Sequence, residues 1–431
     1  MSPEIIGIIG VIALIVMIGL RIWIGAALAV VGFVGTLVLN GWLAAMGVAV
    51  NAPFSQLDSY TTTAIPMFTL MGMIIAETDI GKNLFDFANK FLGRRRGGVA
   101  SATVVASGFM GAITGSDNVA CVIMSKLAIP ELKRLNYADS LATSAVAAAS
   151  PLALLIPPSM PMIMYAMLME QSVGTLFISG IGPGILMTIA FVIAITITCI
   201  RKPHLGPMGE VFTRKEKLRS LWGVVPIIIL FLIVLGGIYF GICTPTEAGA
   251  LGSIGAFIIA IICGQITFKK LNRILLETVL AVGFVMFMLV GTFVFIRFIT
   301  LSRLPFMITN FIVSLSMPPF VILFFVAVMY VILGMMMPQI PMMILTVPLI
   351  TPAMMALGYD VIWFAVFVVM MMALGAISPP IAMNCFLVSG LSGVPVSTVF
   401  RGVWPFIIAN LVVIFLVCLI PQIALWLPSL M

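Results

Sequence analysis

The sequence predicts an all-α polytopic membrane protein, and three features of its composition lead to this fold class. Hydrophobic residues make up 62% of the 431-residue chain, only 8% of its residues are charged, and the mean hydropathy is +1.28. A soluble domain carries about 25% charged residues. A spanning helix needs about 20 apolar residues, so about ten of them would occupy about half of this chain. The composition therefore excludes a soluble enzyme and a soluble domain with a single anchor.

Ten apolar runs predict the spanning helices. They cover about residues 5–20, 22–39, 61–76, 140–168, 176–200, 221–240, 246–263, 275–298, 361–389 and 403–425. Two further apolar stretches, 99–130 and 318–357, are long enough to cross the membrane twice. Polar, Gly or Pro residues interrupt both stretches near the middle. We therefore expect each of them to turn inside the membrane.

The distribution of Lys and Arg predicts how the chain is threaded. Of 21 such residues, 19 lie in a few clusters, and clusters of this kind mark cytoplasmic loops. The clusters are Arg21, 82–96, 126–134, 201–219, 269–273 and Arg401. Stretch 99–130 then begins and ends on the cytoplasmic side, and stretch 318–357 begins and ends on the other side. We predict about ten spanning helices, two re-entrant hairpins and both termini in the periplasm.

An offset of 222 residues relates two halves of the chain. The double proline Pro157-Pro158 recurs at Pro379-Pro380, and the same shift carries Ser116 onto Pro338 at the middle of the second hairpin. Two halves of opposite orientation, with broken helices at matching places, are typical of secondary transporters.

Three segments follow from this symmetry. Residues 1–200 form the first repeat, with a re-entrant hairpin at about 99–130 and a broken helix at about 140–168. Residues 201–220 form a cytoplasmic linker. Residues 221–431 form the second repeat, with a hairpin at about 318–357 and a broken helix at about 361–389.

The candidate site lies where the backbone is irregular at membrane depth, because such backbone must be buried or line a wet cavity. Proline frees carbonyl groups that suit a sodium ion, and the N-termini of half-helices suit an anionic group. The alternative is a pair of structural kinks, with each Ser bonded to its own helix. The predicted site comprises Thr114, Gly115, Ser116, Asp117, Asn118, Pro157, Pro158, Ser159, Met337, Pro338, Gln339, Ala376, Ser378, Pro379, Pro380 and Asn384.

Asp117 is the most informative residue of the predicted site. A carboxylate inside a membrane segment costs at least about 2.5–3.5 kcal/mol, so it is expected to face water or a cation. We predict a sodium site at Ser116, Asp117 and Ser378. In the alternative, Asp117 caps the second helix of the hairpin, and both roles are compatible. The amide of Gln339, at the second tip, could face the substrate.

No enzymatic motif is present, and we predict a protein that is not an enzyme and has no cofactor. The six Cys residues form no CxxC motif, and the one histidine, His204, lies in a polar loop. The oxygen-rich breaks and the position of the single histidine in a loop favour sodium ions over protons as the coupling ions. The net charge of +7 reflects membrane topology rather than a nucleic-acid partner.

Several motifs together resemble a known family. They are AIPMFTLMGMII, LFDFANKFLGRRRGG, GAITGS, ALLIPPSMPMIMYA, GIGPGILM, TPTEAGALG and SPPIAMNCF, in this order. The set is similar to the large membrane subunit (M, or DctM-like) of tripartite ATP-independent periplasmic (TRAP) transporters. One departure stands out: small apolar residues usually follow the Gly-Ser of the first tip, whereas Asp117 and Asn118 follow it here.

The resemblance implies sodium-driven uptake of an organic acid, of the C4-dicarboxylate or sialic acid type, across the bacterial inner membrane by an elevator motion. It also implies two partners. One is a periplasmic substrate-binding protein, and the other is a small four-helix membrane subunit, expected here as a separate chain because this sequence starts at its first helix.

Two other functions remain open at this point. A self-sufficient sodium–dicarboxylate carrier of related architecture would take up substrate without a soluble partner. A channel with re-entrant loops would conduct much faster and would need no sodium gradient.

The predicted topology can be tested by cysteine labelling. In a cysteine-free variant, an impermeant thiol reagent added from the periplasm should label Ser2→Cys but not Lys215→Cys, because only the former lies outside. The reverse pattern would overturn the orientation and the sides assigned to both hairpins.

Overall fold

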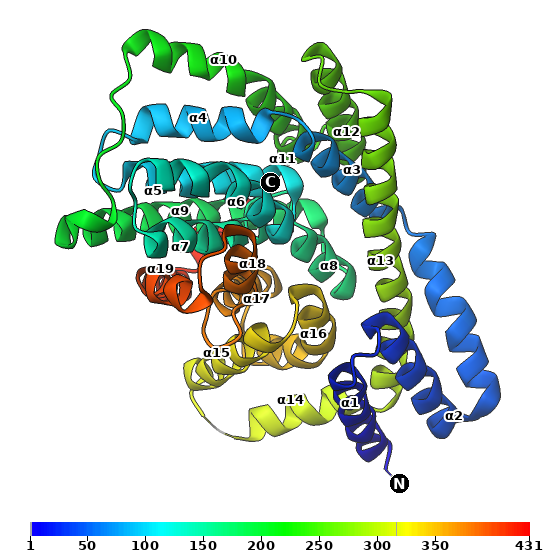
Figure 1. Cartoon of the computed structure of the whole chain (residues 1–431). Helices are drawn as coiled ribbons and strands as arrows, with labels where there is room; N and C mark the ends of the chain where they lie inside the picture. Colours follow the sequence, from blue (N-terminus) through cyan, green and yellow to red (C-terminus); the bar gives the residue numbers. More distant parts are fainter. Residues whose placement is uncertain (1, 316) are drawn as a thin grey trace.

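The computed structural model describes residues 2–315 and 317–431, and every regular element within them is helical (Figure 1). The main helices of the first half are α1 (Pro3–Gly19), α2 (Ile24–Leu57), α3 (Ala64–Ala76), α4 (Ile80–Leu92), α5 (Gly98–Thr114), α6 (Asp117–Arg134), α7 (Asp139–Ala149), α8 (Met160–Leu168) and α9 (Val173–Arg201). Those of the second half are α10 (Arg214–Phe231), α12 (Pro245–Ile262), α13 (Phe268–Leu301), α14 (Leu304–Ser314), α15 (Pro319–Met336), α16 (Gln339–Ala356), α17 (Val361–Gly375), α18 (Met383–Ser392) and α19 (Val396–Leu419). The predicted fold class is confirmed.

Eight helices of the described chain are long and apolar enough to cross a membrane, and a ninth span results if Tyr60–Ala76 is joined to α4 across a 68° bend. Two of the eight, α15 and α16, are the arms of the second hairpin. The length criterion omits α1, which has 17 residues, and both broken helices. With these and Tyr60–Ala76 included, the arrangement agrees with about ten spanning helices and two hairpins.

The helices recur with the offset seen in the sequence. Helices α6 and α16 begin at Asp117 and Gln339, and α7 and α17 begin at Asp139 and Val361, in both cases 222 residues apart. The two hairpins, α5–α6 and α15–α16, and the two broken helices, α7–α8 and α17–α18, therefore occupy equivalent places in the two halves.

The connection between the halves is shorter than the predicted linker 201–220. Helix α9 runs to Arg201, and α10 already begins at Arg214. Thr213 and Glu216 form a capping box at this point. Such a box satisfies two free backbone amides at a helix start, which explains why the helix begins inside the polar run.

The helices form two groups that lie side by side in Figure 1. The scaffold group contains α1, α2, α3, α10, α12 and α13, with α2 packed along α13 and α3 along α12. The hairpin group contains both hairpins, both broken helices, α9 and α19. Helix α4 contacts both α5 and α10, and α14 contacts both α16 and α1, so these two helices connect the groups.

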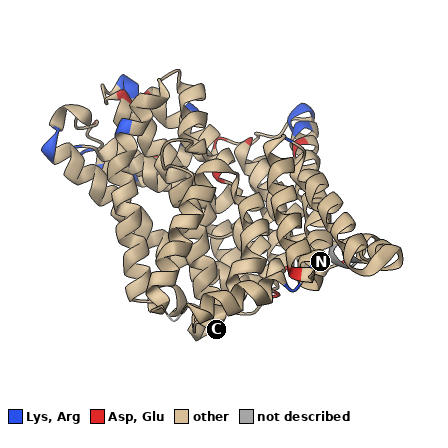
Figure 2. Cartoon of the chain, turned by 90° about the horizontal axis from the view of Figure 1, so that it is seen from below, with Lys and Arg blue, Asp and Glu red and all other residues tan. Residues whose placement is uncertain are grey.

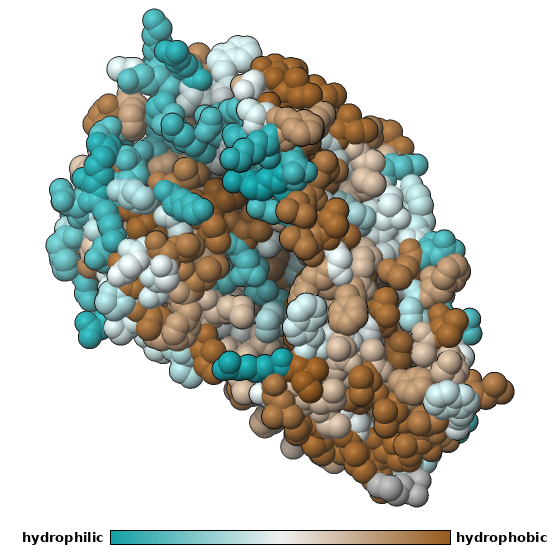
Figure 3. Space-filling view, turned by 45° about the vertical axis from the view of Figure 1, so that its right-hand side comes forward, coloured by the Kyte–Doolittle hydropathy of each residue, from teal (hydrophilic) through white to brown (hydrophobic). Residues whose placement is uncertain are grey.

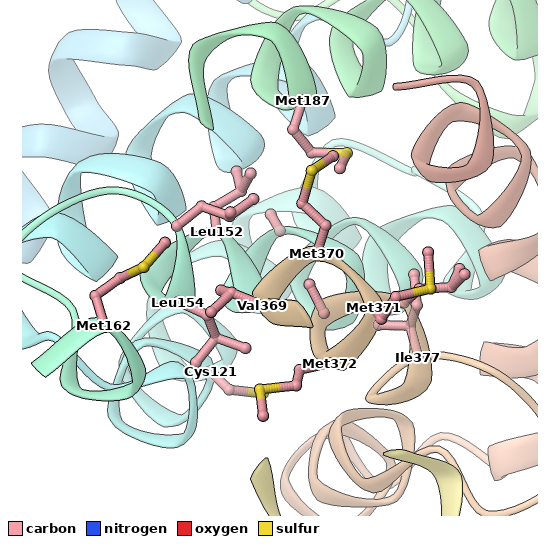
Figure 4. Close-up of a cluster of buried hydrophobic side chains, with 14 of the residues drawn as sticks. Cys121, Leu152, Leu154, Met162, Met187, Val369, Met370, Met371, Met372 and Ile377 are labelled. Carbon is pink, nitrogen blue, oxygen red and sulfur yellow. The ribbon is translucent and has the colours of Figure 1, made fainter. Parts of the chain in front are cut away.

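Side chains from both halves share one core in the hairpin group (Figure 4). Met370 and Met372 of α17 lie among Cys121 of α6, Leu152 of the turn Ser150–Leu154 after α7, and Met187 of α9, and all five are buried. The flexible methionine side chain fills irregular gaps between helices. Because each half contributes to this core, the hairpin group packs as one body.

The surface matches a membrane environment with a basic edge. Figure 2 shows most Lys and Arg residues at the edge opposite the two termini. Hydrophilic side chains in Figure 3 lie mainly along one margin, and apolar side chains cover most of the remaining face. Exposed Ile, Leu, Val and Phe side chains on the long helices are expected where lipid replaces water.

Close packing of α2 against α13 generates a stability prediction. A Cβ at Gly32 would lie 2.7 Å from the backbone nitrogen of Phe295, whereas a Cβ at Gly47, in the part of α2 that follows the non-helical Gly41, would meet no atom within 4 Å. Gly32→Ala should therefore cost about 1–3 kcal/mol through overpacking and lower the unfolding temperature in detergent. Gly47→Ala should keep or raise it, since Gly weakens a helix interior by about 0.5–1 kcal/mol. Equal unfolding temperatures would contradict this packing.

Candidate functional site

The first hairpin turns at Gly115 and Ser116. Gly115 adopts a left-handed conformation (φ 62°), and its amide donates to the carbonyl oxygen of Gly111. Ser116 is extended and occupies the position before the first turn of α6. Asp117 is therefore the first residue of α6, and the cap position predicted as the alternative role of Asp117 belongs to Ser116.

This tip lies against the break of the first broken helix. A Cβ at Gly115 would lie 2.9 Å from the carbonyl oxygen of Pro158. The amide of Met160 donates to the carbonyl oxygen of Gly115 over 3.4 Å. Only glycine combines the left-handed turn with this approach. The tip of hairpin one and the break at 157–159 thus form one continuous region of irregular backbone.

A side-chain hydrogen bond joins the two hairpin tips. The Nε2 of Gln339 donates to Oδ2 of Asp117 over 2.7 Å. The two residues are equivalent in the two repeats, and each is the first residue of its helix. Asp117 is 3% exposed, and the ion pairs of the described Lys and Arg residues are formed with other carboxylates. A neutral amide is therefore the direct partner of this buried carboxylate.

The serines at the breaks bond to their own helices. Ser159 donates to the carbonyl oxygen of Leu154 over 2.5 Å, and Ser378 donates to that of Leu374 over 2.7 Å. This is the hydrogen bonding expected of a structural kink. The Ser159 hydroxyl also accepts from the backbone amide of Met162 and so caps the start of α8. Asn384 differs: it is fully buried, its side chain lies close to Asp117, and neither polar atom of its side-chain amide forms a hydrogen bond of normal geometry. A buried unsatisfied polar group costs about 1–3 kcal/mol, which marks Asn384 as a candidate for ligand binding.

A cavity of about 180 Å³ lies between the hairpin group and the scaffold group. Both hairpin tips and the start of α8 line one side, and α3 and α13 line the other. The lining residues are Thr69, Gly72, Met73, Thr114, Gly115, Ser116, Asp117, Asn118, Val119, Leu154, Met160, Pro161, Ala281, Val285, Gln339 and Ile340. Gly72 permits the closest approach of the groups, since a Cβ there would lie 2.9 Å from Cα of Thr114.

The structure brings part of the predicted site together. The residues that line the cavity are Thr114, Gly115, Ser116, Asp117, Asn118 and Gln339. Pro157, Pro158 and Ser159 lie behind Gly115, and Met337 and Pro338 precede Gln339. Residues that do not line it are Ala376, Ser378, Pro379, Pro380 and Asn384. Of the three predicted sodium ligands, Ser116 and Asp117 line the cavity and Ser378 does not.

The sequence analysis missed the scaffold wall of the cavity. Thr69, Gly72 and Met73 belong to the motif AIPMFTLMGMII, which contributed only to the family resemblance. Ala281 and Val285 lie in an ordinary apolar run, and no local feature distinguishes them.

Inverted repeats, two hairpins whose tips meet beside two broken helices, and a cavity at this junction together define a secondary transporter. Comparison with known proteins then identifies the family. Residues 11–423 match the family described as the tripartite ATP-independent periplasmic transporter, DctM component. The chain belongs to this family, and the predicted resemblance is confirmed.

Individual relatives agree with this assignment. The chain is 32% identical over 380 residues to the C4-dicarboxylate TRAP transporter large permease protein DctM of Pseudomonas aeruginosa (87% of this chain, 88% of the relative). It is 29% identical over 376 residues to the sialic acid TRAP transporter large permease protein SiaM of Vibrio cholerae (87% of each chain). The crystal structure of the YdaH transporter of Alcanivorax borkumensis has a similar fold, with a TM-score of 0.62 at 14% identity over 90% of this chain and 89% of that chain.

The docking of the first tip generates a prediction with a matched control. Gly115 and Gly393 both have positive φ, but only at Gly115 would a Cβ meet another atom within 4 Å, the carbonyl oxygen of Pro158. Alanine at either position would have to adopt a left-handed backbone conformation, which costs about 1–2 kcal/mol. Gly115→Ala should additionally displace the tip and reduce uptake at least about tenfold per folded protein, while Gly393→Ala keeps most of the activity. Similar uptake by both variants in proteoliposomes would show that tip docking is not required.

Proposed function

We propose that this large TRAP permease carries an organic acid of the C4-dicarboxylate or sialic acid type into the cell, driven by a sodium gradient. The substrate would bind in the cavity between the hairpin tips and the scaffold group. The volume of about 180 Å³ is smaller than the 300–1,000 Å³ typical of pockets for larger ligands. This favours the smaller, C4-dicarboxylate class.

The observation that carries the proposal is a buried carboxylate in the cavity wall that forms no ion pair with a described Lys or Arg residue. Asp117 faces a neutral amide over 2.7 Å, and the N-termini of α6 and α16 meet beside it. Helix N-termini favour an anionic substrate. A carboxylate on a substrate bound in this cavity and the one on Asp117 would repel each other, and the repulsion is stronger in a low-dielectric site than in water. A cation bound between them removes the repulsion, which couples anion uptake to the cation.

Sodium rather than a proton suits the groups that surround Asp117. The irregular backbone at 115–116 and 157–159 offers carbonyl oxygens, and the neighbouring side chains are hydroxyls and amides. Hard cations prefer oxygen ligands of this kind. The described residues hold no group of three or more His, Cys, Asp or Glu residues, so the ligand set differs from that of a transition-metal site.

The proposed transport cycle moves the hairpin group past the scaffold group in an elevator motion. The basic edge (Figure 2) would face the cytoplasm, which leaves both termini in the periplasm of a bacterium with this protein in its inner membrane. A periplasmic binding protein would deliver the substrate, and a small four-helix membrane subunit would be a separate chain. The alternative is a self-sufficient sodium–dicarboxylate carrier that needs neither partner.

Transport in proteoliposomes tests the proposal. The chain is reconstituted with the small subunit, and uptake of succinate or N-acetylneuraminate is measured with and without the cognate binding protein. An inward sodium gradient should drive uptake of one of these acids, and only with the binding protein present. Uptake driven equally well by a pH gradient in sodium-free buffer would overturn sodium coupling. Equal uptake without the binding protein would favour the self-sufficient carrier.

Asp117→Asn separates the charge of this residue from its hydrogen bond. Asparagine retains a carbonyl oxygen that accepts from Gln339, so the link between the tips can persist. Loss of a charge-assisted contact with the cation costs about 1.5–3 kcal/mol. We expect the sodium concentration for half-maximal uptake to rise roughly ten- to a hundredfold, with the protein level unchanged. The matched control is Asp58→Asn, which removes an exposed carboxylate outside the cavity. An unchanged sodium dependence of Asp117→Asn would remove Asp117 from the cation site.

A further inference from the structure

A second, larger hollow lies on the hairpin group, away from the tips. It is a groove of about 650 Å³ between α9 and α19. The two helices pack against each other, and buried Phe191 and Phe406 meet edge to face with ring centroids 5.4 Å apart beneath it. The scaffold group contributes no residue to the lining. The groove therefore belongs to a site other than the transport cavity.

Two rows of apolar side chains form the walls of the groove. Each row consists of residues four positions apart, which lie on one face of a helix. The rows are Ile189, Ile193 and Ile197 on α9, and Trp404, Ile408 and Val412 on α19. Each of these side chains is about half exposed, for example Ile193 at 52% and Ile408 at 59%. The lining runs from Leu186 to Lys202, which at 1.5 Å per residue is about 24 Å.

Three cations close one end of the groove. Arg201, Lys202 and Arg401 all line this end and are exposed. The nearby carboxylate, Asp139, is 3.6 Å from Lys133, and the other ion pairs of the described chain also involve different residues. Ser140, at the start of α7, adds a hydroxyl to the same end. The groove thus combines a concentrated positive end with an apolar channel.

We propose that this groove binds an anionic phospholipid of the cytoplasmic leaflet. Its phosphate would contact Arg201, Lys202 and Arg401, and one acyl chain would lie between the two apolar rows. The length supports this occupant, because one leaflet contributes about half of the roughly 30 Å hydrocarbon core and the rest of the groove reaches headgroup depth. Basic pockets between helices on the cytoplasmic side are suited to anionic headgroups. The inference uses the proposed orientation, but neither the substrate nor the coupling ion.

The binding can be measured without transport, so its outcome is independent of the proposed function. Purified protein in detergent is titrated with dioleoylphosphatidylglycerol or dioleoylphosphatidylcholine, and bound lipid is counted by native mass spectrometry. The parent protein should retain phosphatidylglycerol at least about tenfold more strongly. The triple variant Arg201→Gln, Lys202→Gln, Arg401→Gln should reduce this preference to less than about twofold.

A control variant removes the same charge elsewhere. Arg214→Gln, Lys215→Gln, Arg219→Gln alters exposed cations of α10 that do not line the groove, and it should keep the preference. A second variant, Ile193→Trp, narrows the channel and should weaken retention of both lipids while all three cations remain. Unfolding temperatures confirm that each variant is folded. Equal retention of the two lipids by the parent, or equal loss in both triple variants, would overturn the proposal. So would a groove variant that loses the small membrane subunit while its lipid preference is unchanged.

Discussion

The arrangement of the helices depends on one constraint. Backbone N–H and C=O groups outside a helix at membrane depth must form hydrogen bonds with protein or with water in a cavity. This chain leaves its helices at four such places, the two hairpin tips and the two double-proline breaks. The structure meets the constraint by packing irregular segments on one another. The backbone amide of Met160 donates to the carbonyl oxygen of Gly115 at the first tip. The backbone amide of Asn384 donates to the carbonyl oxygen of Ala376 within the second break. The surrounding helices enclose these irregular segments. The requirement that buries the breaks therefore also gathers polar groups beside the hairpin tips.

Symmetry brings the two tips together, and departures from symmetry give the site its chemistry. The offset of 222 residues places Asp117 opposite Gln339, and these equivalent residues bond to each other. Two carboxylates at this point would repel, and two amides would leave no charge for a cation. One of each gives a single negative charge with a hydrogen-bonded neighbour. The first break also carries Ser159 where the second has Ile381, so the two halves contribute unequal polar groups to the cavity region.

The fold was largely predictable from the sequence because its strongest determinants are local. Apolar runs of about 20 residues, clusters of cations and double prolines are local features that identified the spans and the hairpins, and the recurrence of the double prolines at a constant offset identified the repeats. Helix ends were less predictable, since a capping box such as Thr213 with Glu216 starts a helix inside a polar run. The tips were recognised as candidates through Asp117. The contributions of Ala281 and Val285 were not predictable, because their role arises only when two helix groups meet and has no signature in an apolar run. The bond of Gln339 to Asp117 likewise required the three-dimensional pairing of the tips.

The boundary beside the cavity has the properties that the proposed elevator motion would require. The polar contacts of α3 and the turn after it stay within the scaffold: Ser253 donates to the carbonyl oxygen of Met67, and Arg273 pairs with Glu77. Toward the hairpin group, α3 presents Gly72, whose missing side chain lets Thr114 approach closely. This contact brings Gly72 against the backbone of Thr114 without a hydrogen bond between them, so no directional bond would have to break in the proposed motion, whereas hydrogen bonds such as that of Ser253 to Met67 hold the scaffold group together. A larger residue at this position would fill the space between α3 and the first tip. In the proposed elevator motion, the same contact that shapes the cavity wall would therefore also set how freely the tip can leave the scaffold.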